Sequence, residues 1–259
     1  MSVRYAYLAT EGPHDVEFIA RLLRLHGLKR ITEEKRLDAY WKPLIPRSFP
    51  HGGDLHKRVP VPSFFASGTV SVAVHAAGGD SRIAEAIEET LALLPSRTLD
   101  AIGALLDADT QQTAAQRFLA LQERLLALKL QLPGKPGSAS QVSPRCGVFI
   151  LPDNQSQGTL EDVLLECAAQ TYPALLSEAQ GLVGRIVPGG PEYQPEDMKD
   201  FLKPAGRNKA AVACMAGVLR PGKAVQVSIQ DNRWLTGQAL KLPRVVGVHD
   251  FLVSLLQLP

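Results

Sequence analysis

The stretch VRYAYLATEGPHDVEFIARLLRLHG, residues 3–27, decides the fold class. Its first part, Val3–Ala9, alternates and is rich in Val, Tyr and Leu, which is typical of a strand. An acidic turn, Thr10–Gly12, follows. Pro13 then suits the first position of a helix, and apolar residues recur every three or four positions until a glycine closes the pattern. The stretch therefore predicts a strand, an acidic turn and an amphipathic helix over Pro13–His26.

The same unit recurs along the chain. Strands are predicted at Thr69–His75, Leu99–Leu106 and Cys146–Leu151, and a helical pattern follows each of them. The second of these strands is almost wholly apolar, as expected for a parallel strand that is covered on both faces. Because right-handed crossovers join such units, residues 1–170 are predicted to form an α/β domain with a mainly parallel sheet and helices on both faces.

Two segments depart from this pattern. Residues 28–67 lose the periodicity and are rich in Pro, Lys and Arg, which predicts a basic inserted loop. The aromatic side chains of this insertion are predicted to tuck into the core rather than to form a stacking surface for single-stranded nucleic acid. Residues 171–259 are predicted to form a C-terminal α/β extension packed on the first domain, with a strand over Ala224–Ile229.

The composition bounds the class of protein. The chain has 259 residues, 28 Lys and Arg and 26 Asp and Glu, so its net charge of +2 gives no dominant field toward nucleic acid or lipid. The three cysteines are far apart and lack zinc-binding spacing, which indicates reduced thiols. A signal peptide and an uninterrupted run of roughly 18 apolar residues are both absent, so we expect a cytoplasmic protein without a membrane partner.

Acidic residues follow three of the predicted strands: Glu11 the first, Asp107 and Asp109 the third, and Asp153 the fourth. The carboxyl ends of parallel strands gather at one edge of a sheet, where α/β proteins bind ligands. Carboxylates packed there would raise each other's pKa, so we expect a shared cation, and oxygen ligands favour Mg²⁺ or Mn²⁺. Alternate residues of an extended chain lie on one face about 6.6 Å apart, so Asp107 and Asp109 can serve one metal ion or flank two.

The order of these acids along the chain resembles that of a known family. Glu11-Gly12 with Asp15 after one strand, then Asp107-x-Asp109 after a later strand, resembles the Toprim domain of topoisomerases, bacterial primases and nucleases similar to the overcoming-lysogenization-defect group. The resemblance covers about residues 1–170 and implies a Rossmannoid α/β fold. It implies that Glu11 is a metal ligand or general acid/base, that Asp107 and Asp109 bind Mg²⁺, and that Asp15 is a further ligand.

The nuclease branch of this family implies two further roles. Another acid lies near a later strand–helix junction, a place that Glu161 or Asp153 can fill. A lysine near the end of the domain matches Lys209, which would neutralise charge at the phosphorus centre, while Arg207 beside it would orient a phosphate. Asp15 and Glu161 also have a local interpretation, because acids in the first turn of a helix commonly cap it.

The sequence lacks a P-loop and a primase-like zinc motif, so a fused ATPase is not expected. We expect a Mg²⁺-dependent protein that cleaves phosphodiesters, as a DNA or RNA endonuclease in nucleic-acid processing or phage defence; that setting comes from the resemblance. The alternative is a non-catalytic metal- or nucleic-acid-binding module that works with a separate ATPase or effector protein. A phosphohydrolase of small nucleotides is a third interpretation.

Overall fold

The computed structural model describes residues 3–47, 61–94, 99–108 and 112–259. A six-stranded sheet has the strand order β2-β3-β4-β1-β5-β6. In chain order the strands are β1 (Arg4–Thr10), β2 (Lys29–Ile31), β3 (Ser63–Ala66), β4 (Val70–Ala76), β5 (Ala101–Asp107) and β6 (Arg145–Leu151).

The four strands predicted from the sequence are β1, β4, β5 and β6. They lie side by side in the sheet and are parallel, whereas β3 is antiparallel to both β4 and β2 at one edge. The predicted α/β fold with a mainly parallel sheet is thus confirmed. In β5, AIGALLD, every residue before the terminal aspartate is buried and the aspartate itself is half-buried, because helices cover both faces of the sheet.

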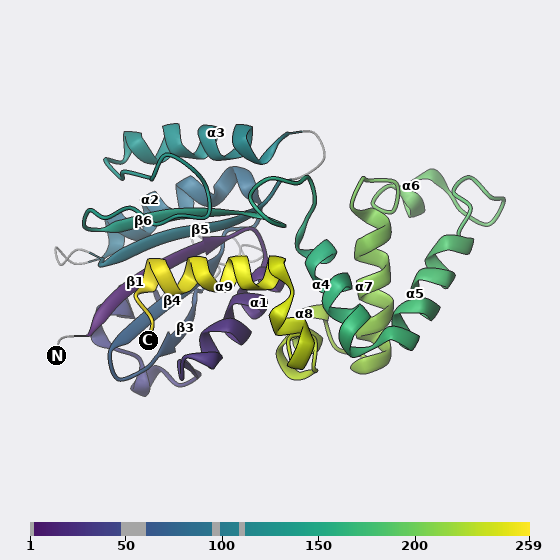
Figure 1. Cartoon of the computed structure of the whole chain (residues 1–259), viewed down its shortest axis with the longest axis horizontal. Coiled ribbons are helices and arrows are strands. Elements are labelled where there is room, and N and C mark those ends of the chain that lie inside the picture. The colour runs from purple at the N-terminus through teal and green to yellow at the C-terminus, as the bar shows by residue number, and fades with distance from the viewer. Residues whose placement is uncertain (1–2, 48–60, 95–98, 109–111) are drawn as a thin grey trace.

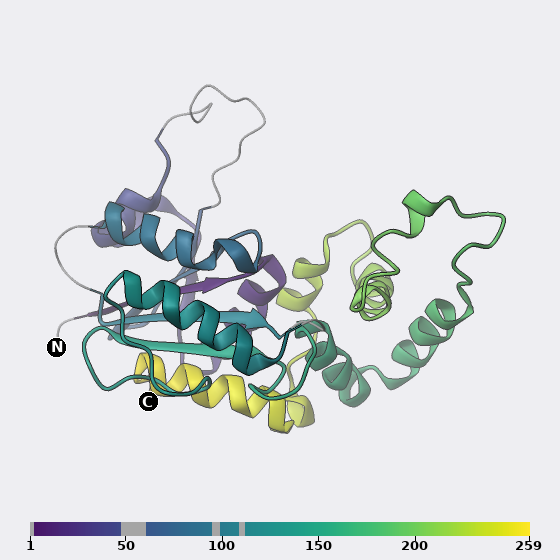
Figure 2. The same cartoon turned by 90° about the horizontal axis from the view of Figure 1, so that it is seen from above.

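Helices cover the sheet on both sides (Figures 1 and 2). One face carries α1 (Pro13–Leu25) and α9 (Pro243–Leu256), and the other carries α2 (Ile83–Leu93) and α3 (Ala114–Ala127). Alternate residues of β1 enter the two cores: Leu8 packs on the first face and Tyr7 on the second. None of the helices in the described ranges has the length and hydropathy that a membrane span requires.

Helix α9 packs closely on β5 and β6 because two glycines make room for it. A Cβ atom at Gly103 would lie 2.5 Å from Cδ2 of Leu255, and one at Gly147 would lie 2.8 Å from Cε2 of Phe251. These distances are shorter than van der Waals contact. The last helix of the C-terminal extension therefore completes one of the two cores of the α/β domain.

A helical lobe, residues 160–241, lies beyond the carboxyl ends of the parallel strands (Figure 1). Its helices are α4 (Leu160–Thr171), α5 (Pro173–Arg185), α6 (Pro195–Met198), α7 (Gly206–Leu219) and α8 (Val225–Asp231), and a 3-10 turn, Gly237–Lys241, follows them. The described residues after β6 contain no strand, so the extension is helical rather than α/β.

The strand predicted over Ala224–Ile229 is therefore wrong, because this segment belongs to helix α8. Its apolar residues fit both periods: they alternate, but Val225 and Ile229 are also one helical turn apart. Tertiary contacts select the helix. Ile229 is fully buried, and the neighbouring Ser228 accepts a 3.0 Å hydrogen bond from the indole of Trp234.

The insertion over residues 28–67 is not a loop throughout. Its described part forms β2, β3 and two 3-10 turns, Glu34–Arg36 and Ala39–Leu44. Trp41 is fully buried and donates from Nε1 to Oγ of Ser71 over 2.8 Å. Its ring packs 6.0 Å from that of Phe64, which is also buried. The prediction that the aromatic residues tuck into the core is confirmed for these two, while Phe49 lies outside the described residues.

Candidate functional site

The boundary between β1 and β5 is a topological switch point. From β1 the chain runs through α1 toward β4, whereas from β5 it runs through α3 to β6, in the opposite direction and on the other face. Open α/β sheets bind ligands at such a point, outside the carboxyl ends of the strands. Glu11 follows β1 and Asp107 ends β5. Oε1 of Glu11 accepts a 2.9 Å hydrogen bond from the backbone N–H of Asp107, so the two acids meet at the switch point.

Three carboxylates of this site are each held through one oxygen by a backbone amide. Besides Glu11, Asp107 accepts through Oδ1 from the N–H of Leu160 over 2.9 Å, and Asp15 accepts through Oδ2 from the N–H of Gly12 over 2.8 Å. Between described residues, no hydrogen bond reaches the second oxygen of any of the three. Each carboxylate is therefore fixed in place while one of its oxygens can still bind a cation.

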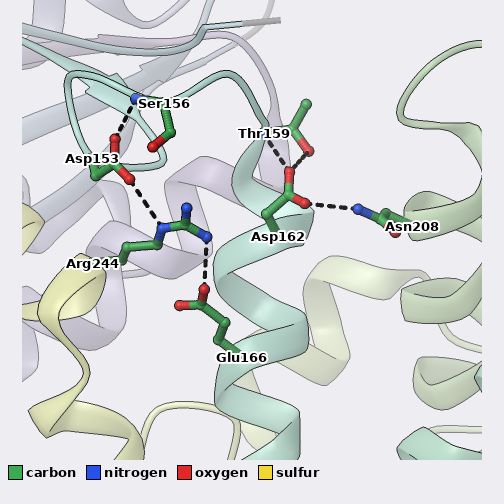
Figure 3. Close-up of polar contacts among 7 residues, drawn as sticks. All are labelled: Asp153, Ser156, Thr159, Asp162, Glu166, Asn208 and Arg244. Carbon is green, nitrogen blue, oxygen red and sulfur yellow. Dashed lines mark hydrogen bonds and ion pairs between the residues drawn. The ribbon is translucent and has the colours of Figure 1, made fainter. Parts of the chain in front are cut away.

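Glu161, in the first turn of α4, faces the same acids. Its Oε2 accepts from the hydroxyl of Thr159 over 2.9 Å, and its Oε1 lies 3.7 Å from Nδ1 of His14. Capping of α4 falls to Asp162 instead. Oδ2 of Asp162 accepts from the N–H of Thr159 over 2.8 Å, and Oδ1 accepts from the amide group of Asn208 over 2.8 Å (Figure 3). The second of these bonds ties the start of α7 to α4.

The acids perturb one another electrostatically. Burial raises the pKa of Asp107 well above its usual value, and the charges of Asp15, Glu11 and Glu161 raise it further. Burial likewise raises the pKa of Asp15 to about 7 and that of Glu11 above its usual value. Glu161 differs: burial opposes its ionisation, but the adjacent imidazole of His14 and the charge of Lys209 keep its pKa below the usual value. A bound cation relieves such repulsion.

Two adjoining cavities share Glu11, Asp107 and Lys209. The smaller, about 240 Å³, is lined mainly by acids and backbone: Glu11, Gly12, Pro13, His14, Asp15, Gly78, Gly79, Asp107, Leu160, Glu161 and Lys209. The larger, about 360 Å³, is lined by Glu11, Asp107, Arg117, Thr159, Lys203, Pro204, Ala205 and Lys209. Acids thus gather on one side of Glu11 and Asp107, and bases on the other.

Of the residues that the structure describes, three with basic side chains line the larger cavity. Lys203 and Lys209 come from the helical lobe, and Arg117 comes from the first turns of α3. The side chain of Arg117 is 12% exposed; it forms an ion pair with Asp80, in the turn after β4, and donates from Nε to the carbonyl of Ala108 over 3.3 Å. The larger cavity therefore offers charges that suit an anion beside the carboxylates.

Two residues predicted for the site lie elsewhere, and one cannot be placed. Arg207 stacks on the ring of Phe201, with 4.9 Å from Cζ to the ring centroid, and donates to the carbonyl of Val183 over 3.2 Å. It lines neither cavity. Asp109 lies outside the described residues, so the predicted pairing with Asp107 has no structural description.

Asp153 is engaged in a structural network away from the cavities (Figure 3). Its Oδ1 accepts from the N–H of Ser156 over 2.6 Å, and its Oδ2 accepts from Nε of Arg244 over 3.2 Å. Arg244 also donates to Glu166 over 2.7 Å, which links α9 to α4 and to the loop after β6. Although partial burial opposes it, these hydrogen bonds lower the pKa of Asp153. The structure therefore gives this acid an arginine partner rather than a place beside Glu11.

Sequence reasoning missed Arg117, Lys203 and Thr159. The sequence did contain a signal for Arg117. A helix that follows a strand with an acidic last residue begins at the same edge of the sheet, and Arg117 lies near the start of such a helix. Thr159 could have been found as the residue before a predicted helix that starts at this edge. Lys203 had no such signal, since its place depends on how the segment between α6 and α7 folds back toward the sheet.

The donor chemistry of the acids fits a hard divalent cation such as Mg²⁺ or Mn²⁺, which prefers oxygen ligands. In the described ranges, however, the acids surround the smaller cavity without converging on one point: no three His, Cys, Asp or Glu side chains are already arranged to hold a metal ion.

Comparisons with known proteins identify a family. One solved structure, that of the hypothetical protein PH0156 from Pyrococcus horikoshii OT3, aligns over 97% of this chain and 100% of that one, with 16% sequence identity and a TM-score of 0.49. No curated protein matches the chain. A family model described as "Protein of unknown function (DUF3226)" matches residues 5–256, a range that includes Glu11, Asp107 and Lys209. The chain therefore belongs to the DUF3226 family.

Proposed function

We propose that this chain hydrolyses phosphodiesters of DNA or RNA with the help of Mg²⁺ or Mn²⁺. The observation that carries the proposal is the contact between Glu11 and Asp107 at the switch point, where an acidic cavity and a basic cavity adjoin. The Toprim resemblance of the same two acids, and of Asp15, supports it. In that family such acids serve phosphoryl chemistry.

Four acids of the described residues are the proposed ligands, and they are Glu11, Asp15, Asp107 and Glu161, all of which line the smaller cavity. Asp109 is added from its sequence position alone. Asp153 is not included, since Arg244 neutralises it. When bound, the cation would offset the negative charge that develops on the phosphate under attack.

Hydrolysis adds one water oxygen to phosphorus and releases one alcohol, so one proton leaves the water and one reaches the departing oxygen. Glu11 is the proposed group for moving this proton, because it lines both the acidic and the basic cavity. Lys209 also lines both cavities and is the proposed cation that stabilises the charge on the phosphate.

Incubation of the purified protein with plasmid and with single-stranded oligonucleotide, in Mn²⁺ and in EDTA, tests the proposal. The wild type is expected to cleave in Mn²⁺ and not in EDTA. Asp107→Ala is expected to lower the cleavage rate by roughly 10²-fold or more. Glu88→Gln, an exposed position on α2, is the matched control and should cleave like the wild type. Equal cleavage by Asp107→Ala, or none by the wild type, would contradict hydrolysis.

A second candidate function is a non-catalytic module that binds metal or nucleic acid and serves a separate ATPase or effector protein. In the described residues the acids are not already arranged around an ion, which metal-dependent cleavage would require and binding of nucleic acid through the basic cavity would not. Calorimetric titration with Mg²⁺ separates the two. Binding that Asp107→Ala abolishes, without any cleavage in the assay above, supports the module.

The proposed setting is nucleic-acid processing or phage defence in the cytoplasm. The thiols of Cys146, Cys167 and Cys214 are all free, which suits a reducing compartment. Detection of the protein in a cytosolic fraction of its host would support the setting.

A further inference from the structure

We infer that the larger cavity is a phosphate-binding site, in which Arg117 and Lys203 bind the phosphate of a phosphate ester next to the acids. The inference rests on the proposed function for the choice of phosphate among oxyanions. Neither residue belongs to the acidic motif, and both are additional to Lys209. Three features support it: the division of charge between the cavities, the way Arg117 is held, and the turn that presents Lys203.

The two cavities differ in charge although they share Glu11, Asp107 and Lys209. Among the described residues, only the larger one adds cations, Arg117 and Lys203, and only the smaller one adds further acids, Asp15 and Glu161. A metal-assisted reaction at phosphate needs this separation, because the anion must approach the acids without meeting more negative charge. The basic cavity therefore lies where the phosphate would have to sit.

Arg117 is held with its guanidinium already oriented. It is nearly buried, and its position is fixed from two sides by the ion pair with Asp80 and by the hydrogen bond from Nε to the carbonyl of Ala108. Asp80 is 43% exposed, so water solvates the outer partner of the pair while the arginine lines the cavity. An arginine fixed in this way loses little conformational entropy when its positive charge attracts a phosphate into the cavity. Asp80 is thus a positioning residue.

Lys203 reaches the cavity from a tight turn before α7. The N–H of Gly206 donates to the carbonyl of Lys203 over 2.8 Å, and a Cβ at Gly206 would lie 2.3 Å from the carbonyl oxygens of Asp200 and Phe201. This close approach fixes the backbone of the turn. The exposed ammonium group pairs with Asp200 over 2.6 Å, a pair that water weakens and that a phosphate can replace.

The experiment measures binding, without metal or turnover. A fluorescent single-stranded oligonucleotide is titrated with the full-length protein in EDTA and about 0.1 M salt, and fluorescence anisotropy gives Kd. Arg117→Gln and Lys203→Gln are each expected to raise Kd roughly three- to ten-fold, and Arg117→Lys should recover part of the loss. Lys199→Gln is the matched control, because Lys199 is exposed on the same segment and lines neither cavity. Its Kd should stay within about two-fold of the wild type.

A competition arm separates the sources of the phosphate. If a nucleic-acid strand is the ligand, unlabelled oligonucleotide displaces the probe far better than inorganic phosphate or a nucleoside monophosphate. Equal displacement per phosphate assigns the site to small phosphate esters. Wild-type Kd values for both Arg117→Gln and Lys203→Gln overturn the inference, and so does a wild type that binds none of these probes. Lys203 is exposed, so Lys203→Gln decides alone if Arg117→Gln fails to fold.

The outcomes remain separate from those of the proposed function. Weakened binding by both variants, with no cleavage in Mn²⁺, supports the phosphate site and contradicts hydrolysis. Cleavage in Mn²⁺ together with unchanged binding by both variants supports hydrolysis and contradicts the phosphate site.

Discussion

The carboxylate of Glu11 accepts the backbone N–H of Asp107 over 2.9 Å, and this bond joins the ends of two neighbouring parallel strands. Glu11 is thereby held in one orientation although its pKa is raised by burial and by the nearby charge of Asp80. Keeping this poorly solvated acid at the switch point lowers the stability of the fold. Perturbed pKa values of this kind are typical of functional sites.

Replacing Glu11 by Gln separates the role of its charge from that of its hydrogen bond. The amide oxygen of Gln can still accept from Asp107, while the buried negative charge is gone. In EDTA the variant is expected to melt at the same temperature as the wild type or higher. Mg²⁺ should raise the melting temperature of the wild type only, since binding at about 100 times Kd adds about 2.7 kcal/mol. Differential scanning fluorimetry checks this, and an equal Mg²⁺ shift in Glu11→Gln would remove Glu11 from the ligand set.

The raised pKa of Asp15 predicts how the stability of the metal-free protein depends on pH. Its pKa is about 7 in the folded state and 3.8 for a free side chain, so the folded state retains a proton that the unfolded state releases. The contribution of Asp15 to the free energy of unfolding is therefore fully present below about pH 4 and is lost as pH rises toward about 7. The loss amounts to about 1.4 kcal/mol per unit of pKa difference between the folded and unfolded states.

Urea denaturation in EDTA at about pH 5 and about pH 8 measures this loss. Asp15→Asn, whose amide oxygen can still accept from Gly12, should show a smaller decrease than the wild type. Saturating Mg²⁺ should restore wild-type stability at the higher pH, where the acids are ionised. The same decrease in both proteins would assign the pH dependence to other groups.

Asp153 should behave as a structural residue. Asp153→Asn removes the ion pair with Arg244, whose side chain is 27% exposed, so we expect a loss of only about 0.2–1 kcal/mol in the free energy of unfolding. Affinity for Mg²⁺, measured by calorimetry, should not change. Asp107→Asn is the comparison and should lose Mg²⁺ binding. A loss of binding in Asp153→Asn would return this acid to the metal site.

Gly147 should be intolerant of even one methyl group. A Cβ there would lie 2.8 Å from the ring of Phe251 and 2.8 Å from the carbonyl oxygen of Ser138. Gly147→Ala is expected to cost about 1–3 kcal/mol in stability, measured by urea denaturation. Gly217→Ala, in α7, is the control: nothing lies within 4 Å of its Cβ position, and the change should stabilise the protein by up to about 1 kcal/mol. Similar stabilities of the two variants would argue against tight packing of α9.

The parts of this site that the sequence predicts are those fixed by the sheet. Parallel strands end at one edge, so residues directly after β1 and β5 must be close, and Glu11 and Asp107 could be paired from the pattern alone. Asp153 also follows a parallel strand. Its partner Arg244, however, comes from a helix 91 residues later, and no local pattern indicates that contact.

The basic residues show a second limit. Lys209 and Arg207 are two positions apart on α7, and a helix turns about 100° per residue, so their side chains point in nearly opposite directions. The sequence could have indicated that only one of them faces the acids, but not which one. That choice depends on the docking of α7 against α4, where Asn208 bonds to Asp162. Lys203 depends on the same docking.

The seating of α9 over Gly103 and Gly147 also bears on how the chain is synthesised. Residues 243–256 are made after every strand of the sheet, so a ribosome completes β5 and β6 long before their apolar partner exists. Until then Phe149 and the other side chains that α9 covers lack this partner, and apolar surface exposed in this way during synthesis is prone to aggregation.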